Sequence, residues 1–354
     1  MWQVENATPF AAAGNWIRDR EGAEVWLVAV RCTFGIRSDG TTVVTDEQEP
    51  PVLAPVYRGD PATTSLLKDS DFYLTKPTTD VLLHGHAYAP GGNPATDVEV
   101  TLRLGAVSKT LRVIGDRVYE EGIFGVRAGP TKPFVRMPIT YERAYGGREP
   151  DPPANPDCPR FERRNPVGCG FEPIPGRLAP NIAYPNPRLS QHPAGFGPIP
   201  PNWSPRIEYA GTYDEPWQKE RLPLYPKDLD DRFFLCSPED QRPRSPLRGG
   251  ESVELVNMTP GGRLAFVLPR VAFRFETEFQ NKPTVIHRGV LHGVILEPDA
   301  PRVIMVWQTA LPAHADVLRL TQTWVSQLRV INAPPGSVPV GAEADIDEYE
   351  GANE

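Results

Sequence analysis

Cysteine is scarce in this sequence and forms no regular pattern. The 354 residues contain four cysteines at wide and irregular spacings, namely Cys32, Cys158, Cys169 and Cys236. A small disulfide-stabilised scaffold needs far more cysteines per residue, so that architecture is excluded. We expect free thiols in a reducing compartment, which favours the cytoplasm.

Long hydrophobic runs are also missing. The longest uninterrupted apolar run, at 25–30, has six residues, whereas a membrane-spanning helix needs about 20. Residues 1–20 lack the basic start and apolar core of an export signal. We therefore expect neither an export signal nor a membrane anchor.

Positive charge is in deficit. Lys and Arg total 37 against 45 Asp and Glu, which gives a formal net charge of −8. Six of the acidic residues lie in 341–354, which has no Lys or Arg, so the rest of the chain carries only −2. A nearly neutral body has no clustered cations to hold a phosphate backbone, which argues against nucleic acid as a direct partner.

Proline and glycine, by contrast, are abundant. The chain has 42 Pro and 30 Gly, about 20% together against roughly 12% in average proteins. Because proline breaks helix interiors, this excess argues against a helical bundle. The hydrophobic fraction of 40% and the charged fraction of 23% are still those of a globular chain.

Apolar residues recur with period two in the first third of the chain, as expected for strands with one buried face. The alternation in 97–104 predicts a strand with one dry and one wet face. Turn sequences such as those at 38–40 and 90–93 separate these runs. We predict an N-terminal β region over 1–129. A single face of its clearest strand is formed by Trp26, Val28, Val30, Cys32, Phe34 and Ile36.

The middle of the chain, 130–250, is rich in Pro and Gly and shows few periodic segments. Between Pro130 and Pro246 there are 25 prolines in 117 residues, so extended and turn conformations should dominate. Its many aromatic residues are too numerous for a solvated linker, and we expect the segment to pack on the β body. One short helix is predicted near 227–236.

Sheet periodicity returns in a C-terminal β region, 251–332. Apolar and charged residues alternate clearly over 271–279. Residues 315–329 are ambiguous but are predicted as a helix, because Val317, Leu320, Trp324 and Leu328 fit a helical stripe. The acidic tail, 333–354, should be disordered. The predicted fold class is all-β, with mainly antiparallel sandwich-like or barrel-like sheets, an irregular middle and few short helices.

Two histidines, His84 and His86, are the sharpest metal candidate, since a strand would place both on one face. A third ligand could come from Asp80, His287 or His292, but no spacing singles one out. Because a metal site needs three or four converging ligands, two half-exposed strand histidines are the favoured interpretation.

Nucleophilic chemistry has weak support. No G-x-S-x-G or phosphate-binding G-x-x-x-x-G-K-[ST] motif occurs in the sequence. Cys169 lies between two glycines and could pair with His192 in a cysteine hydrolase, but a cysteine that merely fills a glycine-rich turn is favoured.

Paired carboxylates could indicate a glycosidase, which needs two carboxyl groups facing one bond. The available clusters are Asp214 with Glu215, and Asp228 with Asp230 and Asp231. Helix-capping and turn roles are favoured, because Asp prefers both.

An ordered set of short strings resembles a bacterial family known as domain of unknown function 2169, found beside type VI secretion genes. Together the strings cover roughly 6–310. They are NATPF (6–10), RCTF (31–34), KPTTDV (76–81), GDR (115–117), MPITYERAYGG (137–147), NPVGCGF (165–171), PNI (180–182), AGFGP (194–198), GTYDEPW (211–217) and SPEDQ (237–241).

The resemblance implies a cytoplasmic adaptor or chaperone without catalytic activity. Such a protein would bind a secreted toxin effector, stabilise it and help to load it onto the spike protein of the type VI secretion system. The resemblance implies no catalytic, cofactor-binding or metal residues, no cofactor, no membrane partner and no small-molecule substrate. Cys169 departs from related sequences, which more often have a lysine or another non-cysteine residue there, and this argues against a thiol mechanism.

The alternatives are an enzyme and a carbohydrate-binding module. A β-sandwich hydrolase, either metal-dependent or acting on glycosides, would use the histidines or carboxylates named above. A carbohydrate-binding module would use exposed aromatic residues. An adaptor would instead present exposed strand edges and apolar surface to another polypeptide.

Overall fold

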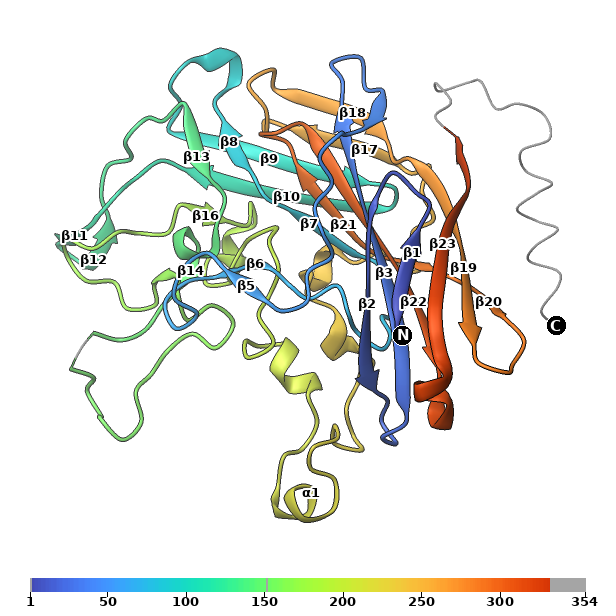
Figure 1. Ribbon diagram of the computed structural model, residues 1–354. Helices are drawn as coiled ribbons and strands as arrows, with labels where there is room; N and C mark the ends of the chain where they lie inside the picture. Colours follow the sequence, from blue (N-terminus) through green and yellow to red (C-terminus); the bar gives the residue numbers. More distant parts are fainter. Residues whose placement is uncertain (1, 151, 332–354) are drawn as a thin grey trace.

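The computed structural model describes residues 2–150 and 152–331, which form a mainly β structure (Figure 1). Within these residues one α-helix and seven short 3₁₀ helices accompany the strands. No helix of the described part is long and apolar enough to span a bilayer. The all-β fold class predicted from the sequence is confirmed.

Three sheets form the body of the protein. The six-stranded sheet contains β2 (Ala11–Arg18), β3 (Glu24–Ile36), β4 (Thr42–Val44), β7 (Asp80–Leu83), β21 (Val290–Glu297) and β22 (Arg302–Pro312). The five-stranded sheet contains β9 (Asp97–Leu104), β10 (Val107–Ile114), β16 (Ile182–Ala183), β17 (Ser252–Val256) and β18 (Arg263–Val267). The four-stranded sheet contains β1 (Gln3–Asn6), β19 (Arg270–Phe279), β20 (Val285–Arg288) and β23 (Leu320–Ile331).

Short elements complete the described chain. The two-stranded ladders are β5 (Val56–Tyr57) with β6 (Leu66–Lys68), β8 (His86–Tyr88) with β13 (Arg136–Pro138), β11 (Tyr119–Gly122) with β12 (Gly125–Ala128), and β14 (Tyr145–Gly146) with β15 (Cys169–Gly170). The helical elements are α1 (Glu215–Glu220) and η1–η7 (Pro90–Gly92, Tyr141–Arg143, Pro187–Leu189, Arg206–Tyr209, Asp231–Phe234, Glu239–Gln241 and His314–Arg319).

Strands from both ends of the sequence share each of the three large sheets. In the six-stranded sheet, β3 pairs with β22 over eleven antiparallel positions. In the five-stranded sheet β9 pairs with β17, and in the four-stranded sheet β1 runs parallel to β23. The N-terminal and C-terminal β regions of the sequence therefore build common sheets.

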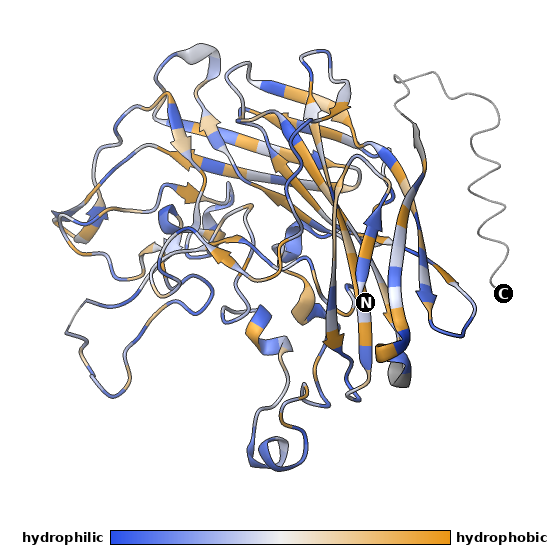
Figure 2. Ribbon diagram, viewed as in Figure 1, coloured by the Kyte–Doolittle hydropathy of each residue, from blue (hydrophilic) through white to orange (hydrophobic). Residues whose placement is uncertain are grey.

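The largest hydrophobic core lies on the inner face of the six-stranded sheet. The six alternate residues from Trp26 to Ile36 all belong to this core, so the predicted face of β3 is confirmed. Leu102 of the five-stranded sheet and Phe275 of the four-stranded sheet join the same core and are fully buried. Figure 2 shows the alternation of hydrophobic and hydrophilic residues along these strands.

The outer face of the six-stranded sheet is buried as well, but under irregular chain. Leu27 of β3 packs in a cluster with Phe72, and Ile304 of β22 packs in another with Leu82 and Cys236. Both Leu27 and Ile304 are completely buried. Of these covering residues, Cys236 belongs to the Pro/Gly-rich middle of the sequence.

Two helix predictions are wrong. Residues 320–331 form β23, which pairs with β1 on one side and β19 on the other. Trp324 is 43% exposed and Leu328 is 50% exposed, although the helical stripe would have buried both. Leu320 is the stripe residue that is buried, and the β-branched Thr323 and Val325, whose alternation suits a strand, are buried as well.

The second helix, predicted near 227–236, is only the 3₁₀ turn Asp231–Phe234. Phe234 is buried at the end of this turn, so a single turn is enough to place its side chain in the core. The α-helix of this segment begins instead after Asp214. The acidic tail, 333–354, lies outside the described residues.

Substitution of the core residue Phe275 tests this packing. Phe275→Ala should lower the free energy of unfolding by about 3–5 kcal/mol, because the side chain is fully buried between the sheets. Phe124→Ala is the matched control, since Phe124 is fully exposed. Guanidinium unfolding curves measure both, and equal midpoints for the two variants would contradict the core.

Candidate functional site

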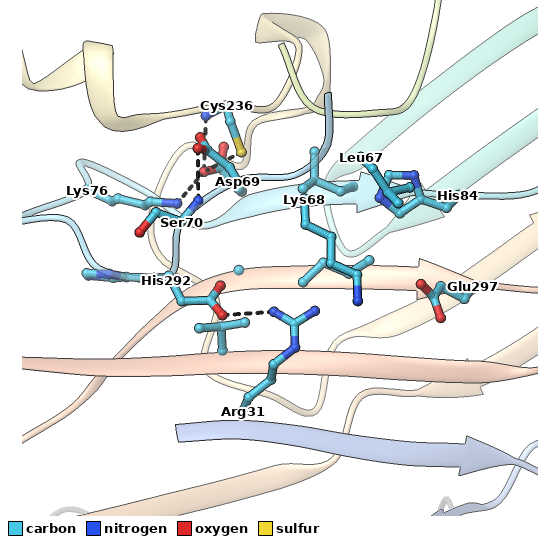
Figure 3. Close-up of a pocket in the computed structure, with 16 residues that line it drawn as sticks. Arg31, Leu67, Lys68, Asp69, Ser70, Lys76, His84, Cys236, His292 and Glu297 are labelled. Atoms are coloured by element: carbon cyan, nitrogen blue, oxygen red, sulfur yellow. Dashed lines mark hydrogen bonds and ion pairs between the residues drawn. The ribbon is translucent and has the colours of Figure 1, made fainter. Parts of the chain in front are cut away.

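Charged side chains gather between the outer face of the six-stranded sheet and the irregular chain that covers it (Figure 3). We call this group the ion-pair cluster. It consists of Arg31, Asp69, Asp71, Lys76, Asp80 and Arg206.

Asp80, on the edge strand β7, anchors one part of the cluster. Its carboxylate pairs with the Lys76 ammonium at 2.7 Å, and both side chains are almost completely buried. It also accepts hydrogen bonds from the Ser237 N–H at 2.8 Å, the Ser237 hydroxyl at 2.6 Å and the Cys236 N–H at 3.2 Å. Burial opposes ionisation of Asp80, but Lys76 and these donors outweigh it and lower the pKa of the carboxyl group.

Arg206 anchors the irregular middle at a second point. Its side chain is 1% exposed and pairs with Asp69 at 2.7 Å. The same guanidinium donates to the carbonyl oxygens of Phe233 at 2.7 Å and Ile199 at 2.8 Å, and to the Tyr73 hydroxyl at 3.2 Å. Burial alone would lower the pKa of Arg206, but the Asp69 charge reverses this and raises it. Arg206 thus binds two backbone carbonyl oxygens of this irregular segment.

Arg31, on β3, projects from the sheet into the same region. Its guanidinium lies 2.9 Å from Asp71 and 3.3 Å from Glu49. Glu49 also pairs with Lys68 at 2.7 Å and with Arg302 at 2.6 Å. Burial raises the pKa of Asp71, whereas the three cations around Glu49 overcome its burial and lower its pKa. The cations of this group are therefore matched by carboxylates.

The outer edge of β7 is closed by the irregular chain that covers the six-stranded sheet, which we call the cover. The Leu83 N–H donates to the Phe196 carbonyl at 3.1 Å. The Gln241 amide donates to the carbonyls of Val81 at 2.6 Å and Phe196 at 2.9 Å. This edge of the six-stranded sheet is consequently unavailable to another strand.

The cavity beside the cluster is small. Its volume of about 30 Å³ gives room for about two water molecules and not for an organic substrate. Burial lowers the pKa of His292 to about 3 and that of His84 to about 4, with nearby cations adding to both effects. A general base works best with a pKa near the operating pH, so neither imidazole is suited to that role.

The histidines considered as metal ligands do not converge. His84 lies between β7 and β8, with its Nδ1 3.4 Å from an Arg58 nitrogen, so the expected pair on one strand face is wrong. His86 Nδ1 instead lies 2.7 Å from Asp299. His287 is held between the hydroxyl groups of Thr277 and Thr309, both at 2.7 Å. Among residues 2–150 and 152–331, no group of three or more His, Cys, Asp or Glu is arranged to hold a metal.

Cys169 does not form an activated nucleophile. All four cysteines of the chain are free, as the sequence predicts. Cys169 lies on β15, and burial raises the pKa of its thiol to about 11, whereas a reactive cysteine needs a lowered pKa. The charges that act on Cys169 are those of Arg143 and Arg117, while His192 is exposed and acts on Glu162.

The acidic pairs have the local roles that were favoured from the sequence. Asp214 accepts from the Trp217 N–H at 2.9 Å at the start of α1, and Asp228 accepts from the Thr212 N–H at 3.0 Å. Asp230 caps η5. The other two form ion pairs, Glu215 with Lys219 and Asp231 with Arg20.

The ion-pair cluster was missed by sequence reasoning. Lys76 and Asp80 lie in the string KPTTDV (76–81), and their four-residue separation was the signal that the sequence offered. The Arg206–Asp69 pair joins residues that are distant in sequence, so no local sequence pattern predicts it.

Removal of the Asp80 charge should destabilise the protein strongly. Asp80→Asn leaves the Lys76 ammonium buried without a counter-charge, which costs about 3–5 kcal/mol in unfolding free energy. Adding Lys76→Met should recover part of that loss. Glu215→Gln, which breaks an exposed ion pair, should leave the guanidinium midpoint unchanged. A loss below about 1 kcal/mol for Asp80→Asn would show that the cluster does not hold the cover.

Stability should fall as the pH is lowered from about 6.5 towards 3. In the unfolded chain His292 has an ordinary pKa of about 6.5, whereas burial first and the Lys76 charge next hold its pKa at about 3 in the folded protein. Between these values only the unfolded chain binds the proton, so His292 contributes a loss of about 2 kcal/mol at pH 5. His292→Gln should remove this contribution from the difference in unfolding free energy between pH 7 and pH 5. The exposed-residue control His192→Gln should keep it, and an unchanged difference in His292→Gln would contradict the assignment.

Comparison with known proteins gives one family. The family described as "Uncharacterized protein conserved in bacteria (DUF2169)" matches residues 21–308. No curated protein and no solved structure matches the chain. The match covers most of the sequence, including β3, the ion-pair cluster and the irregular cover. This chain is therefore a member of the bacterial DUF2169 family.

Proposed function

We propose that the protein is a non-catalytic adaptor that binds a type VI secretion effector in the cytosol, stabilises it and helps to load it onto the secretion spike. The resemblance described above suggests this role. The observation that supports it in the structure is the edge strand β20, which no further strand of residues 2–150 and 152–331 pairs with beyond β19. The hydrolase alternative has no favouring observation among the described residues.

Most edges of the three large sheets are occupied by the chain itself. β7 is closed by Phe196 and Gln241, and Ile182 of β16 forms a bridge with Ala144. The rings of Trp2 and Trp16 meet edge to face, with centroids 5.9 Å apart, where the edge strands β1 and β2 come together.

The edge strand β18 is also approached closely by its own chain. A side-chain carbon added to Gly40 would lie only 2.6 Å from the Ala265 carbonyl oxygen. The turn that contains Gly40 therefore lies directly against β18, and this edge is partly covered.

β20 differs from these edges. It is the last strand of the four-stranded sheet and pairs only with β19 among the strands of the described chain. Val285 is 38% exposed and Ile286 is 48% exposed. Ile286 lies opposite Glu276, which lies opposite Trp324, so the three side chains share the outer face of the sheet.

This arrangement suits strand addition. An extended client segment can pair with the backbone of β20, and main-chain hydrogen bonds of this kind accept many client sequences. Ile286 and the half-exposed Trp324 then supply apolar contact beside the new strand. Such burial depends little on salt, which distinguishes it from a charge-driven contact.

A charge placed on this edge should weaken client binding. Ile286→Lys should reduce the affinity for the purified effector encoded beside this gene by about tenfold or more, because a lysine on an edge strand opposes pairing with another strand. Calorimetric titration at two salt concentrations measures the affinity.

Val267→Lys on β18 is the matched control, because Val267 is 39% exposed on the edge of a different sheet. It should bind the effector as the wild type does, and both variants should keep the wild-type thermal midpoint. Equal affinities for Ile286→Lys and wild type would remove β20 as the client edge. Failure of the wild-type protein to bind the effector would remove the adaptor proposal itself.

A further inference from the structure

The outer face of the four-stranded sheet carries apolar side chains that the core does not use. Trp324 of β23 and Ile286 of β20 are half-exposed and lie in one row, on either side of Glu276. Leu328, at a bulge further along β23, is half-exposed as well. Exposed apolar side chains that lie close together in this way indicate a contact surface.

Positive charge gathers at one end of this face, the end where β23 finishes. Arg288 lies directly opposite Arg274, and two like charges in this position repel each other. Arg270 is exposed and lies opposite Ile331, the last residue of β23. These three arginines therefore favour an anionic partner at this end of the sheet.

The described carboxylates of the face lie at its other end. Glu276 pairs with Arg274 at 2.8 Å. Glu278 accepts a hydrogen bond from the Trp324 indole at 3.1 Å, and Glu5 of β1 lies opposite Trp324 in the register. One of the three carboxylates thus offsets an arginine, and the end of the face near the last residue of β23 keeps a net positive charge.

The loop beside Arg270 does not change this balance. A carbon added to Gly250 would lie only 2.4 Å from the Arg270 Nε, so this loop lies directly against the arginine. The charged residues of the loop, Arg248 and Glu251, have opposite signs. The positive end of the face is therefore determined by the sheet itself.

The sequence that follows β23 has the complementary composition. Residues 341–354 contain six acidic residues and no Lys or Arg, and Ile346 and Tyr349 interrupt the acidic run. Such a segment has too little apolar surface to form a core of its own, so another surface has to supply its contacts. Carboxylates beside an isoleucine and a tyrosine match a face on which arginines lie beside Trp324 and Ile286.

The chain is long enough to bring the segment and the face together. Nine residues, 332–340, separate β23 from the acidic segment, and nine extended residues span up to about 30 Å. Trp324 lies seven residues before Ile331, which is about 23 Å along the strand. β20 is two strands away from β23, which adds about 10 Å across the sheet. A tether of this length gives an effective concentration in the millimolar range, so even a weak contact is populated.

We propose that residues 341–354 dock on the outer face of the four-stranded sheet, with carboxylates on Arg270 and Arg288 and apolar residues on Trp324 and Ile286. The contact is made within one chain, because the segment is attached beside the face that it complements. It occupies the surface next to β20, so a partner that pairs with β20 has to displace it. Only this last consequence rests on the proposed adaptor function.

A spin label in the acidic segment tests the contact in the full chain. Ala344→Cys carries the label in a Cys158→Ser background, because Cys158 is the exposed native cysteine. The Ile286 methyl signal should lose about half or more of its intensity, because a tethered segment is docked in a large share of the molecules. The Ile123 methyl signal is the internal control and should keep its intensity, since Figure 1 places the β11–β12 hairpin and β20 on opposite sides of the molecule.

Substitution of the arginines tests what holds the segment. Arg270→Gln/Arg288→Gln should restore most of the Ile286 intensity, because the carboxylates lose their partners. Ionic strength of 1 M should act in the same direction, since the Debye length falls to about 3 Å. The matched control, Arg177→Gln/Arg188→Gln, removes two exposed arginines of the irregular middle and should leave the signal loss unchanged.

Three results would overturn the docking: full Ile286 intensity in the labelled protein, equal losses for Ile286 and Ile123, or a loss that persists in Arg270→Gln/Arg288→Gln. A loss that grows with protein concentration would show that the segment binds a second copy of the chain, and the proposal would again be wrong.

Neutralising the acidic segment tests the consequence for β20. Asp345→Asn/Asp347→Asn/Glu348→Gln/Glu350→Gln should raise the affinity for the purified effector about twofold or more, because the share of molecules open to binding increases. An unchanged affinity would show that a client does not compete with the segment. If the wild-type protein binds no effector, the adaptor function fails, while the spin label still decides whether the segment docks.

Discussion

The outer face of the six-stranded sheet is covered by chain that forms few ladders, so the polar backbone of that cover needs partners other than neighbouring strands. Asp80 and Arg206 supply them. Asp80 holds the backbone at 236–237, and Arg206 holds the carbonyls of Ile199 and Phe233. Because both charges are themselves paired, with Lys76 and Asp69, the cover gains hydrogen bonds without leaving a bare charge in the interior.

This use of charge also limits what the buried region can do. A catalytic site needs polar groups that are available to bind a substrate or exchange a proton with it. In this cluster the carboxylates already accept hydrogen bonds, and the cations already pair with carboxylates. The adjacent cavity admits little more than water. The apolar side chains that the core does not use lie instead on the surface, on β20 and on the β11–β12 hairpin.

Segments with one clear hydrophobic period were predicted correctly from the sequence, whereas a segment that fits both the helical and the strand period was not. The alternation from Trp26 to Ile36 predicts one face of β3, because a strand places every second residue on the same side. The segment with Leu320, Trp324 and Leu328 fits both periods, and only its position between β1 and β19 makes it a strand. The buried ion pairs were not predicted, because the sequence does not show whether a charged residue is solvated or paired with a residue distant in the chain.

The sequence by itself determined the all-β class, the buried face of β3 and the free cysteines. These follow from local chemistry: side-chain alternation, proline geometry and residue counts. Only the tertiary structure decided which strands share a sheet, which carboxylate pairs with Arg206, and which apolar side chains of the described residues are exposed. Such pairings join residues that are distant in the chain, so they depend on the tertiary fold and not on local sequence.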